Sequence, residues 1–219
     1  YTAAVAVSAD GAFLAAAGRS TPDATMAVRH LSSGSEIGRI PLSTELAFSP
    51  SGRYLAAGGG LWELTSTDRG HSLKPTTLPT EASFDVRGVA FSPDARYFAR
   101  AVAVADNRRV ELWSLPDLTR RGGFSSDVAV AGLAVSAGGR YVAVAGSYAV
   151  EVREPATEYS VIVQHGSPRA LAFSLDEPTL AIGDGAGTLT LWKITSLADD
   201  ARVRPPGVVK DAGFSHDGR

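Results

Sequence analysis

Six serines recur along this chain, and they are the first residues whose type and spacing could do chemistry. They are Ser8, Ser49, Ser92, Ser136, Ser174 and Ser215. A catalytic serine is a single nucleophile with a base beside it, whereas each of these closes a short apolar run and opens a turn. The sequence also lacks the G-x-S-x-G and H-E-x-x-H patterns of hydrolases. We therefore interpret these serines as turn residues and predict that the chain is not an enzyme.

Metal and phosphate sites are equally poorly supported by the sequence. The four histidines are scattered without ligand spacing, and the absence of cysteine removes disulfides and thiolate ligands. The glycine-rich residues 183–188 (GDGAGT) could cradle a phosphate only if a helix followed them. A strand pattern follows instead, so we predict a hairpin turn and no cofactor.

The serines repeat because larger units of the chain repeat. Their spacings are 41, 43, 44, 38 and 41 residues. Within residues 171–194, three strand patterns (LAFS, TLAI and TLTLWKI) follow one another with turn residues between them. Several short strands within a period near forty residues are typical of propeller blades. The sequence therefore predicts an all-β fold, a β-propeller of four-stranded antiparallel blades.

The repeated units resemble the WD-repeat family. The pattern V-A-F-S-P-D-G recurs in degenerate form, and third strands end in Leu-Trp at Trp113 and Trp192, while a Gly-His-like signal survives at His165. The resemblance implies a structural role for these three residues, with Arg153 and His30 standing where other blades would carry the tryptophan. It also implies one domain over residues 1–219, with repeats starting near residues 3, 44, 87, 131, 170 and 210. Five units and the start of a sixth would then be part of a seven-bladed ring.

Two blades carry features that depart from this pattern. In the second unit only 8 residues separate Tyr54 from Trp62, so either a tight glycine loop joins the two strands or residues are missing from the numbering. The polar segment that follows contains prolines and predicts a ragged outer strand. In the fifth unit, residues 194–203 are expected to connect the third strand to the fourth.

Composition limits the classes of partner. The 219 residues are 44% hydrophobic, which allows a large buried core, and the net charge of −2 disfavours a nucleic-acid binder. No apolar run reaches the roughly 18 residues that a membrane-spanning helix requires. A cytoplasmic location is expected. The 18 arginines among 21 basic residues point to a bacterial source.

A group of charged residues is predicted at the top-face rim of the channel, where innermost strands begin in WD-repeat propellers. Arg87, Arg169 and Lys210 occupy this repeat position, and Asp106 and Asp184 lie in nearby hairpins. Guanidinium groups pair bidentately with carboxylates and phosphates. We expect this rim to bind a protein or peptide partner.

The function expected from the sequence is a non-enzymatic scaffold or sensor platform for protein–protein interaction, within a larger signalling or effector protein. Two alternatives remain at this stage. One is a propeller that binds a small acidic ligand or peptide in its channel mouth, and the other is a propeller hydrolase or lyase.

Overall fold

The structure is a computed structural model, which describes most of the chain. The described residues are 4–17, 25–43, 45–67, 70–78, 85–104, 107–156, 160–164, 166–177, 179–194 and 198–203. Every statement below concerns these residues.

The described chain forms five four-stranded antiparallel sheets, which we call blades 1 to 5 in chain order. Blades 1 and 2 consist of β1 (Ala4–Val7), β2 (Phe13–Ala17), β3 (Thr25–His30) and β4 (Glu36–Pro41), then β5 (Leu46–Phe48), β6 (Tyr54–Ala57), β7 (Gly60–Thr67) and β8 (Gly70–Thr76). Blade 3 consists of β9 (Asp85–Phe91), β10 (Tyr97–Val104), β11 (Asn107–Ser114) and β12 (Arg120–Ser125). Blades 4 and 5 consist of β13 (Gly132–Val135), β14 (Val142–Ala145), β15 (Ala149–Arg153) and β16 (Ser160–Gln164), then β17 (Pro168–Phe173), β18 (Thr179–Asp184), β19 (Leu189–Lys193) and β20 (Ala198–Val203).

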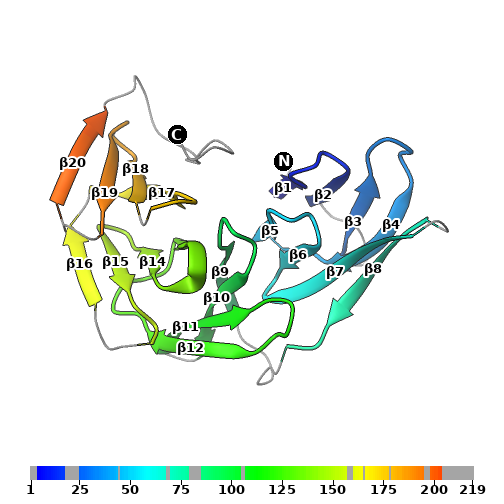
Figure 1. Ribbon diagram of the computed structural model, residues 1–219, viewed down its shortest axis with the longest axis horizontal. Coiled ribbons are helices and arrows are strands. Elements are labelled where there is room, and N and C mark those ends of the chain that lie inside the picture. Colours follow the sequence, from blue (N-terminus) through cyan, green and yellow to red (C-terminus); the bar gives the residue numbers. More distant parts are fainter. Residues whose placement is uncertain are drawn as a thin grey trace.

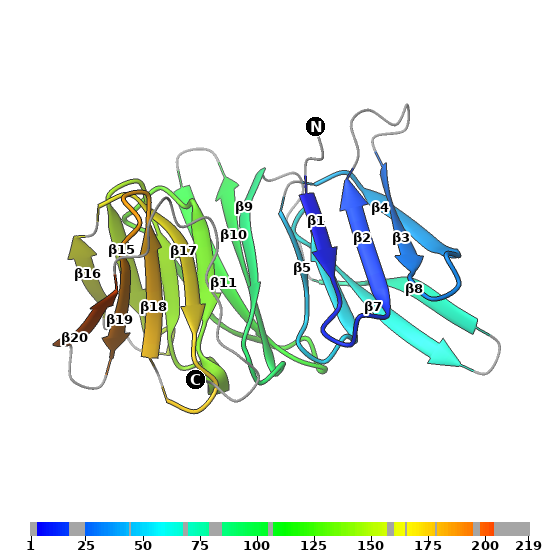
Figure 2. The same cartoon turned by 90° about the horizontal axis from the view of Figure 1, so that it is seen from above.

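The blades stand side by side along an arc, with the first strand of each blade on the inside (Figure 1). The first strands of successive blades contact one another from β1 to β17. Seen from above, β1, β2, β17 and β18 run close to the direction from which Figure 1 is viewed, whereas β7 and β8 run obliquely to it (Figure 2). The only helical element among the described residues is a short 3-10 turn, η1 (Ala137–Gly139). The predicted all-β propeller is confirmed.

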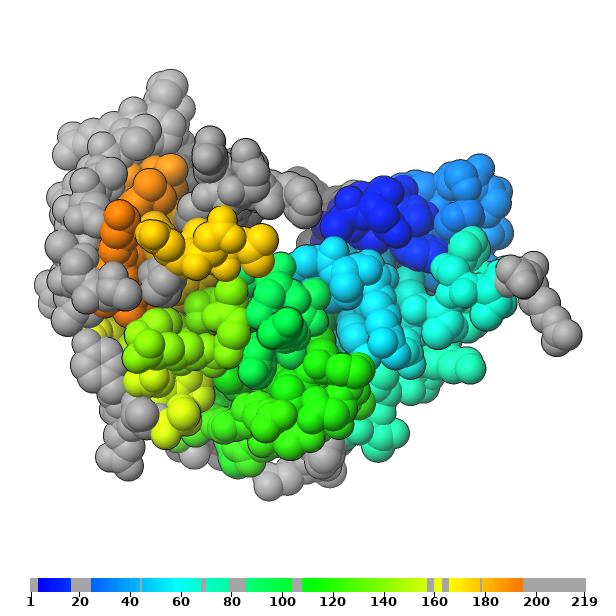
Figure 3. All heavy atoms as spheres, in the orientation of Figure 1, coloured from blue at the N-terminus to red at the C-terminus, as the bar shows by residue number. Residues whose placement is uncertain are grey.

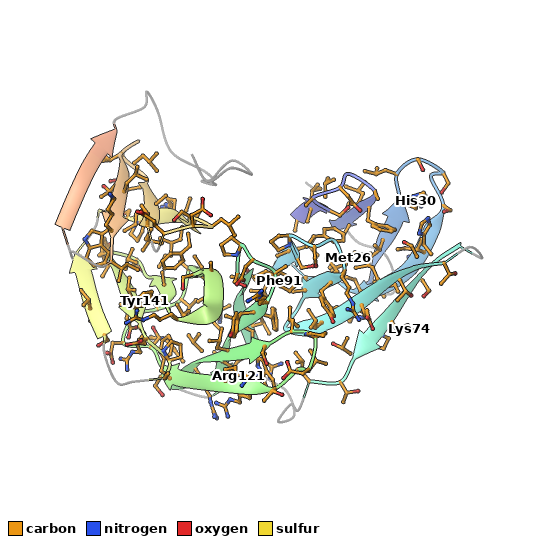
Figure 4. The ribbon with its side chains drawn as sticks, in the orientation of Figure 1. Met26, His30, Lys74, Phe91, Arg121 and Tyr141 are labelled. Carbon is orange, nitrogen blue, oxygen red and sulfur yellow. The ribbon has the colours of Figure 1, made fainter. Side chains whose placement is uncertain are left out.

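The hydrophobic core lies between the blades rather than within one layer. Four clusters of buried residues each combine side chains from two neighbouring blades. Met26, Phe91 and Tyr141, labelled in Figure 4, belong to or pack against three of these clusters. Successive blades are accordingly in direct contact along the arc (Figure 3). The recurring aromatic residues are packing residues, because burial between two sheets stabilises both of them.

Blade 1 presents an apolar face on the side away from blade 2. Val5 and Val7 on β1 are 57% and 50% exposed. Leu46 and Phe48, at the equivalent positions of β5, pack against the cluster between blades 1 and 2. The first strand of blade 1 thus exposes apolar side chains at the positions where the first strand of blade 2 packs against its neighbour.

The repeated serine holds the turn between the first and second strands. The hydroxyls of Ser8, Ser49 and Ser136 each accept a hydrogen bond of 2.9 Å from the backbone N–H five residues later. The N–H of each serine in turn donates to the carbonyl of that same later residue. All five described serines of the set are at most 5% exposed. They are turn residues, as predicted, because the hydroxyl satisfies a buried backbone donor.

The third residue after each serine adopts a left-handed backbone conformation in the first four blades. This residue is Gly11, Gly52 and Gly139 in blades 1, 2 and 4, with φ between 67° and 70°, but Ala95 in blade 3, with φ 57°. A Cβ atom disfavours this conformation by about 1–2 kcal/mol. Replacing Ala95 by glycine is therefore expected to raise the free energy of unfolding by about 1 kcal/mol, after the entropic cost of glycine is subtracted. Chemical denaturation of both proteins measures this, and a less stable Ala95→Gly variant would contradict the explanation.

Blade 2 resolves the question of its short hairpin. Ala57 pairs with Gly60, so Gly58 and Gly59 alone form the turn, with φ of 54° and 76°. Positive φ at both central residues is the requirement of a type I′ turn, which glycine meets without strain. The tight glycine loop is the correct alternative.

The predicted ragged outer strand is wrong, because β8 pairs with β7 over its full length without a register shift. Its Pro75 is tolerated because β8 is an edge strand of the sheet.

Two smaller expectations are also corrected. In blade 3 the tryptophan position is that of Trp113, which pairs with Phe98. The equivalent pair in blade 1 is Leu14 with Arg29, so Arg29 and not His30 occupies the tryptophan position there. Part of the segment expected to be a connection in blade 5 forms strand β20, which pairs with β19. The Pro205-Pro206 segment lies outside the described residues.

Candidate functional site

The predicted rim consists of the positions where the innermost strands begin. Arg87 near the start of β9 and Arg169 near the start of β17 are both exposed. Ala131, immediately before β13, is exposed between them in the order of the blades. The strands that carry these residues are held by the packed interfaces beneath, so the rim has a rigid support.

Arg169 lies beside the hairpin that joins β18 to β19. A Cβ atom built on Gly185 would be 3.7 Å from Arg169 Nε and 3.8 Å from Ser167 Cβ. The N–H of Gly185 also donates to the Ser167 carbonyl at 3.1 Å. The start of β17 and this hairpin are therefore in direct contact, and a Cβ atom at position 185 would make ordinary van der Waals contact with Arg169 and Ser167.

Asp184 builds that hairpin. It is 6% exposed, and its Oδ1 atom accepts hydrogen bonds from the N–H groups of Ala186 at 2.9 Å and Thr188 at 2.8 Å. The aspartate holds the turn that supports Arg169, a typical use of an Asp side chain at the start of a turn. The glycine-rich segment is a hairpin followed by a strand, as predicted, and does not have the loop–helix geometry of a phosphate cradle.

Three of the predicted residues, Asp106, His165 and Lys210, lie outside the described residues. Trp113 and Trp192, expected to be structural, are 3% and 6% exposed and belong to inter-blade clusters. Trp113 Nε1 is buried without a hydrogen-bond partner. The tryptophans therefore act by packing.

Two rim residues were missed by the sequence analysis. Glu45, at the start of the inner segment of blade 2, is half-buried, and desolvation by this burial raises the pKa of its carboxyl group. Tyr148, in the hairpin that joins β14 to β15, is 78% exposed. Glu45 was overlooked because Thr44 was aligned with Arg87. A search for aromatic residues within hairpins would have found Tyr148.

Below the surface, blade 3 contains a buried ion pair whose arginine also contacts blade 2. Arg100 is 1% exposed and donates to Glu111 Oε2 from Nε at 2.9 Å and from Nη2 at 2.7 Å. Its Nη1 atom donates to the carbonyl of Gly59, in the glycine hairpin of blade 2, at 3.0 Å. Arg100 therefore neutralises a nearly buried carboxylate and fixes the neighbouring hairpin at the same time.

A second buried carboxylate stabilises the connection from blade 3 to blade 4. Glu151 is fully buried, and its Oε2 atom accepts from the Ser126 hydroxyl at 2.8 Å and from the Asp127 N–H at 3.1 Å. Its Oε1 atom accepts from Arg153 Nε at 2.7 Å. Arg153, which takes the tryptophan position of this blade, is thus held by a carboxylate rather than by packing alone.

No group of three or more potential metal ligands occurs among the described residues. Each described serine of the repeat uses its hydroxyl for turn hydrogen bonds and is buried. No helix in this part of the chain is both long and apolar enough to cross a bilayer.

The five blades define a β-propeller. Residues 62–114, from strand β7 to the end of β11, match the family described as WD domain, G-beta repeat. The resemblance expected from the sequence is confirmed for this stretch. Among solved structures, the chain is similar to "Kuenenia stuttgartiensis Hydrazine Synthase", with a TM-score of 0.68 and 17% sequence identity over 99% of this chain and 78% of that chain. This likeness concerns the fold. No curated protein matches the sequence at a significant level.

Proposed function

We propose that this propeller is a non-enzymatic platform for protein–protein interaction, a scaffold or sensor within a larger bacterial, cytoplasmic signalling or effector protein. Its binding surface is the rim at the start of the inner strands, and its partner is a protein or peptide with acidic groups. The residues that bind are Arg87 and Arg169, together with Lys210, Asp106 and the hairpin that Asp184 holds.

The observation that carries this proposal is the placement of two exposed arginines at equivalent positions of blades 3 and 5. Both stand on strands that are packed against neighbouring blades, so little conformational entropy is lost by the backbone when a partner binds. The exposed Tyr148 belongs to blade 4, between them in chain order. Arginine and tyrosine, with tryptophan, are the side chains enriched at the interface positions that contribute most of the binding energy.

A second candidate function is binding of a small acidic ligand or peptide at the channel mouth, through the same arginines. A hydrolase or lyase is a weaker alternative, since it needs acids or histidines gathered at one place. The two binding functions differ in the size of the ligand: a peptide of several residues would contact Tyr148 as well as the arginines, and a small acid would not.

Replacing Arg87 and Arg169 together by alanine is expected to weaken partner capture at least tenfold while the melting temperature changes by less than about 2 °C. Exposed side chains contribute little to folding, but arginines at an interface can contribute more than 1 kcal/mol each to binding. The measurement is affinity capture by the full protein followed by titration of the captured partner against each variant.

The matched control is the double replacement of Arg96 and Arg140 by alanine. These exposed arginines lie in the turns between first and second strands, at the opposite end of the blades, and the change in net charge is the same. Equal loss of binding in the control would show that only net charge matters. Loss of stability in the rim variant would instead assign Arg87 and Arg169 a structural role.

A further inference from the structure

Three arginine side chains of blade 3 converge on one carboxylate. Arg100 occupies Glu111 Oε2 with two hydrogen bonds. Arg109 Nε and Arg120 Nη2 approach the other oxygen, Oε1, at 3.7 Å and 3.8 Å. These two distances exceed those of a guanidinium–carboxylate hydrogen bond, which lie near 2.7–2.9 Å. Arg109 and Arg120 are thus attracted to Glu111 without being bonded to it.

The local charge at this cluster is unbalanced. Three guanidinium groups face one carboxylate, which leaves two positive charges in excess. The cross-strand neighbours do not add an acid, because Arg109 lies between Val102 and Ser125 and Arg120 pairs with Trp113. Within the described part of the chain, neither Arg109 nor Arg120 donates a side-chain hydrogen bond. Their donors are therefore available to an anion.

Access and room for an anion are also present. The side chains of Arg109 and Arg120 are each 38% exposed, whereas those of Arg100 and Glu111 are 2% and 11% exposed. Gly123 lies opposite Glu111 on β12, and a Cβ atom there would be 2.8 Å from Arg120 Nη2. The glycine lets Arg120 fold across its own strand toward Glu111. The two partly exposed guanidinium groups of Arg109 and Arg120 consequently lie next to the buried Glu111 carboxylate, whose charge Arg100 already neutralises.

We propose that Arg109 and Arg120 form a binding site for an oxyanion of the phosphate class, either free phosphate or a phosphate monoester. A phosphate group offers several acceptor oxygens, which two planar guanidinium forks can engage at once. The buried Arg100–Glu111 pair acts as the support that orients both forks. This site is on the outer two strands of blade 3 and is separate from the rim on the inner strands.

The proposal is tested by calorimetric titration of the full chain with inorganic phosphate at pH 7.5 and low ionic strength, and in parallel with O-phosphoserine. Saturable binding of one anion per chain is expected, and it should weaken as chloride is added. Replacing either Arg109 or Arg120 by glutamine should weaken binding at least tenfold. Tighter binding of O-phosphoserine identifies a monoester as the ligand, and binding of inorganic phosphate alone identifies the free ion.

The control is Arg121→Gln, a change of the same charge at the next position of the same strand, which Figure 4 labels. Arg121 donates to the Ser114 hydroxyl at 3.0 Å and pairs with Asp117 at 3.5 Å, so its charge already has an acidic partner of its own. This variant should retain phosphate binding. Absence of binding by the wild-type chain, or equal weakening in all three variants, would overturn the proposal. Arg109→Lys and Arg120→Lys keep the charge and serve if a glutamine variant does not fold.

Discussion

Replacing Glu111 by glutamine is expected to lower the free energy of unfolding by about 3–5 kcal/mol, because Arg100 would remain buried without a counter-charge. Arg100 is 1% exposed, so its charge cannot reach water without opening the interface between blades 2 and 3. For a chain of this size each kcal/mol corresponds to about 2–4 °C in melting temperature. Thermal and chemical denaturation measure the effect.

The matched control for this variant is Glu63→Gln. Glu63 also pairs with an arginine, Arg53, at 2.6 Å, but the two side chains are 27% and 53% exposed. An exposed pair contributes about 0–1 kcal/mol, since water replaces the lost partner. If Glu111→Gln and Glu63→Gln destabilise the protein equally, burial of Arg100 does not set the cost of losing its counter-charge.

Replacing Gly139 by alanine is expected to destabilise the protein by about 3 kcal/mol, through backbone strain and overpacking together. Gly139 has a φ of 67°, and a Cβ atom there would lie 2.6–2.8 Å from three ring atoms of Tyr97 in the neighbouring blade. The ring is partly buried and packs against the cluster that blades 3 and 4 share, so moving it away from Gly139 would disturb that packing.

A substitution at Gly138, the residue before Gly139, separates backbone strain from the clash with Tyr97. Gly138 has a φ of 72°, but a Cβ atom there would have nothing within 4 Å. Gly138→Ala should therefore cost only the backbone strain, about 1 kcal/mol after the lower unfolded-state entropy of alanine is counted. Its N–H can still donate to Asp94 Oδ2, a 2.8 Å bond from blade 4 to blade 3. Denaturation curves of both variants give the comparison, and equal costs would rule out the clash with Tyr97.

The repeat made much of the fold predictable from the sequence. In blades 1 to 4 the repeated serine is followed five residues later by an aromatic residue, and its hydroxyl accepts a hydrogen bond from the backbone N–H of that residue, so the turn is stabilised locally. The glycines at positions 58 and 59 similarly predict a tight hairpin, because few other residues adopt two positive φ values in succession. These features depend on neighbours in sequence, so they need no knowledge of how blades pack.

The charged residues were less predictable because their partners come from other strands or blades. Arg100 and Glu111 pair only because β10 and β11 meet in a particular register, and Gly59 joins them from blade 2. The error over His30 has the same origin, since hairpin register decides that Arg29 stands opposite Leu14. Asp184 was predicted at the rim, but only the geometry of its turn shows that its Oδ1 atom is used by the backbone.

The order of strands within the blades has a consequence for how the chain folds. Every strand pairs with the strand next to it in sequence, so each blade can form from one continuous stretch without waiting for a distant segment. The entropic cost of closing such short loops is low, and folding of this kind can begin in any blade and spread to its neighbours. Contacts between blades, such as the hydrogen bond from Arg100 to the Gly59 carbonyl, then allow a folded blade to stabilise its neighbour as that neighbour folds.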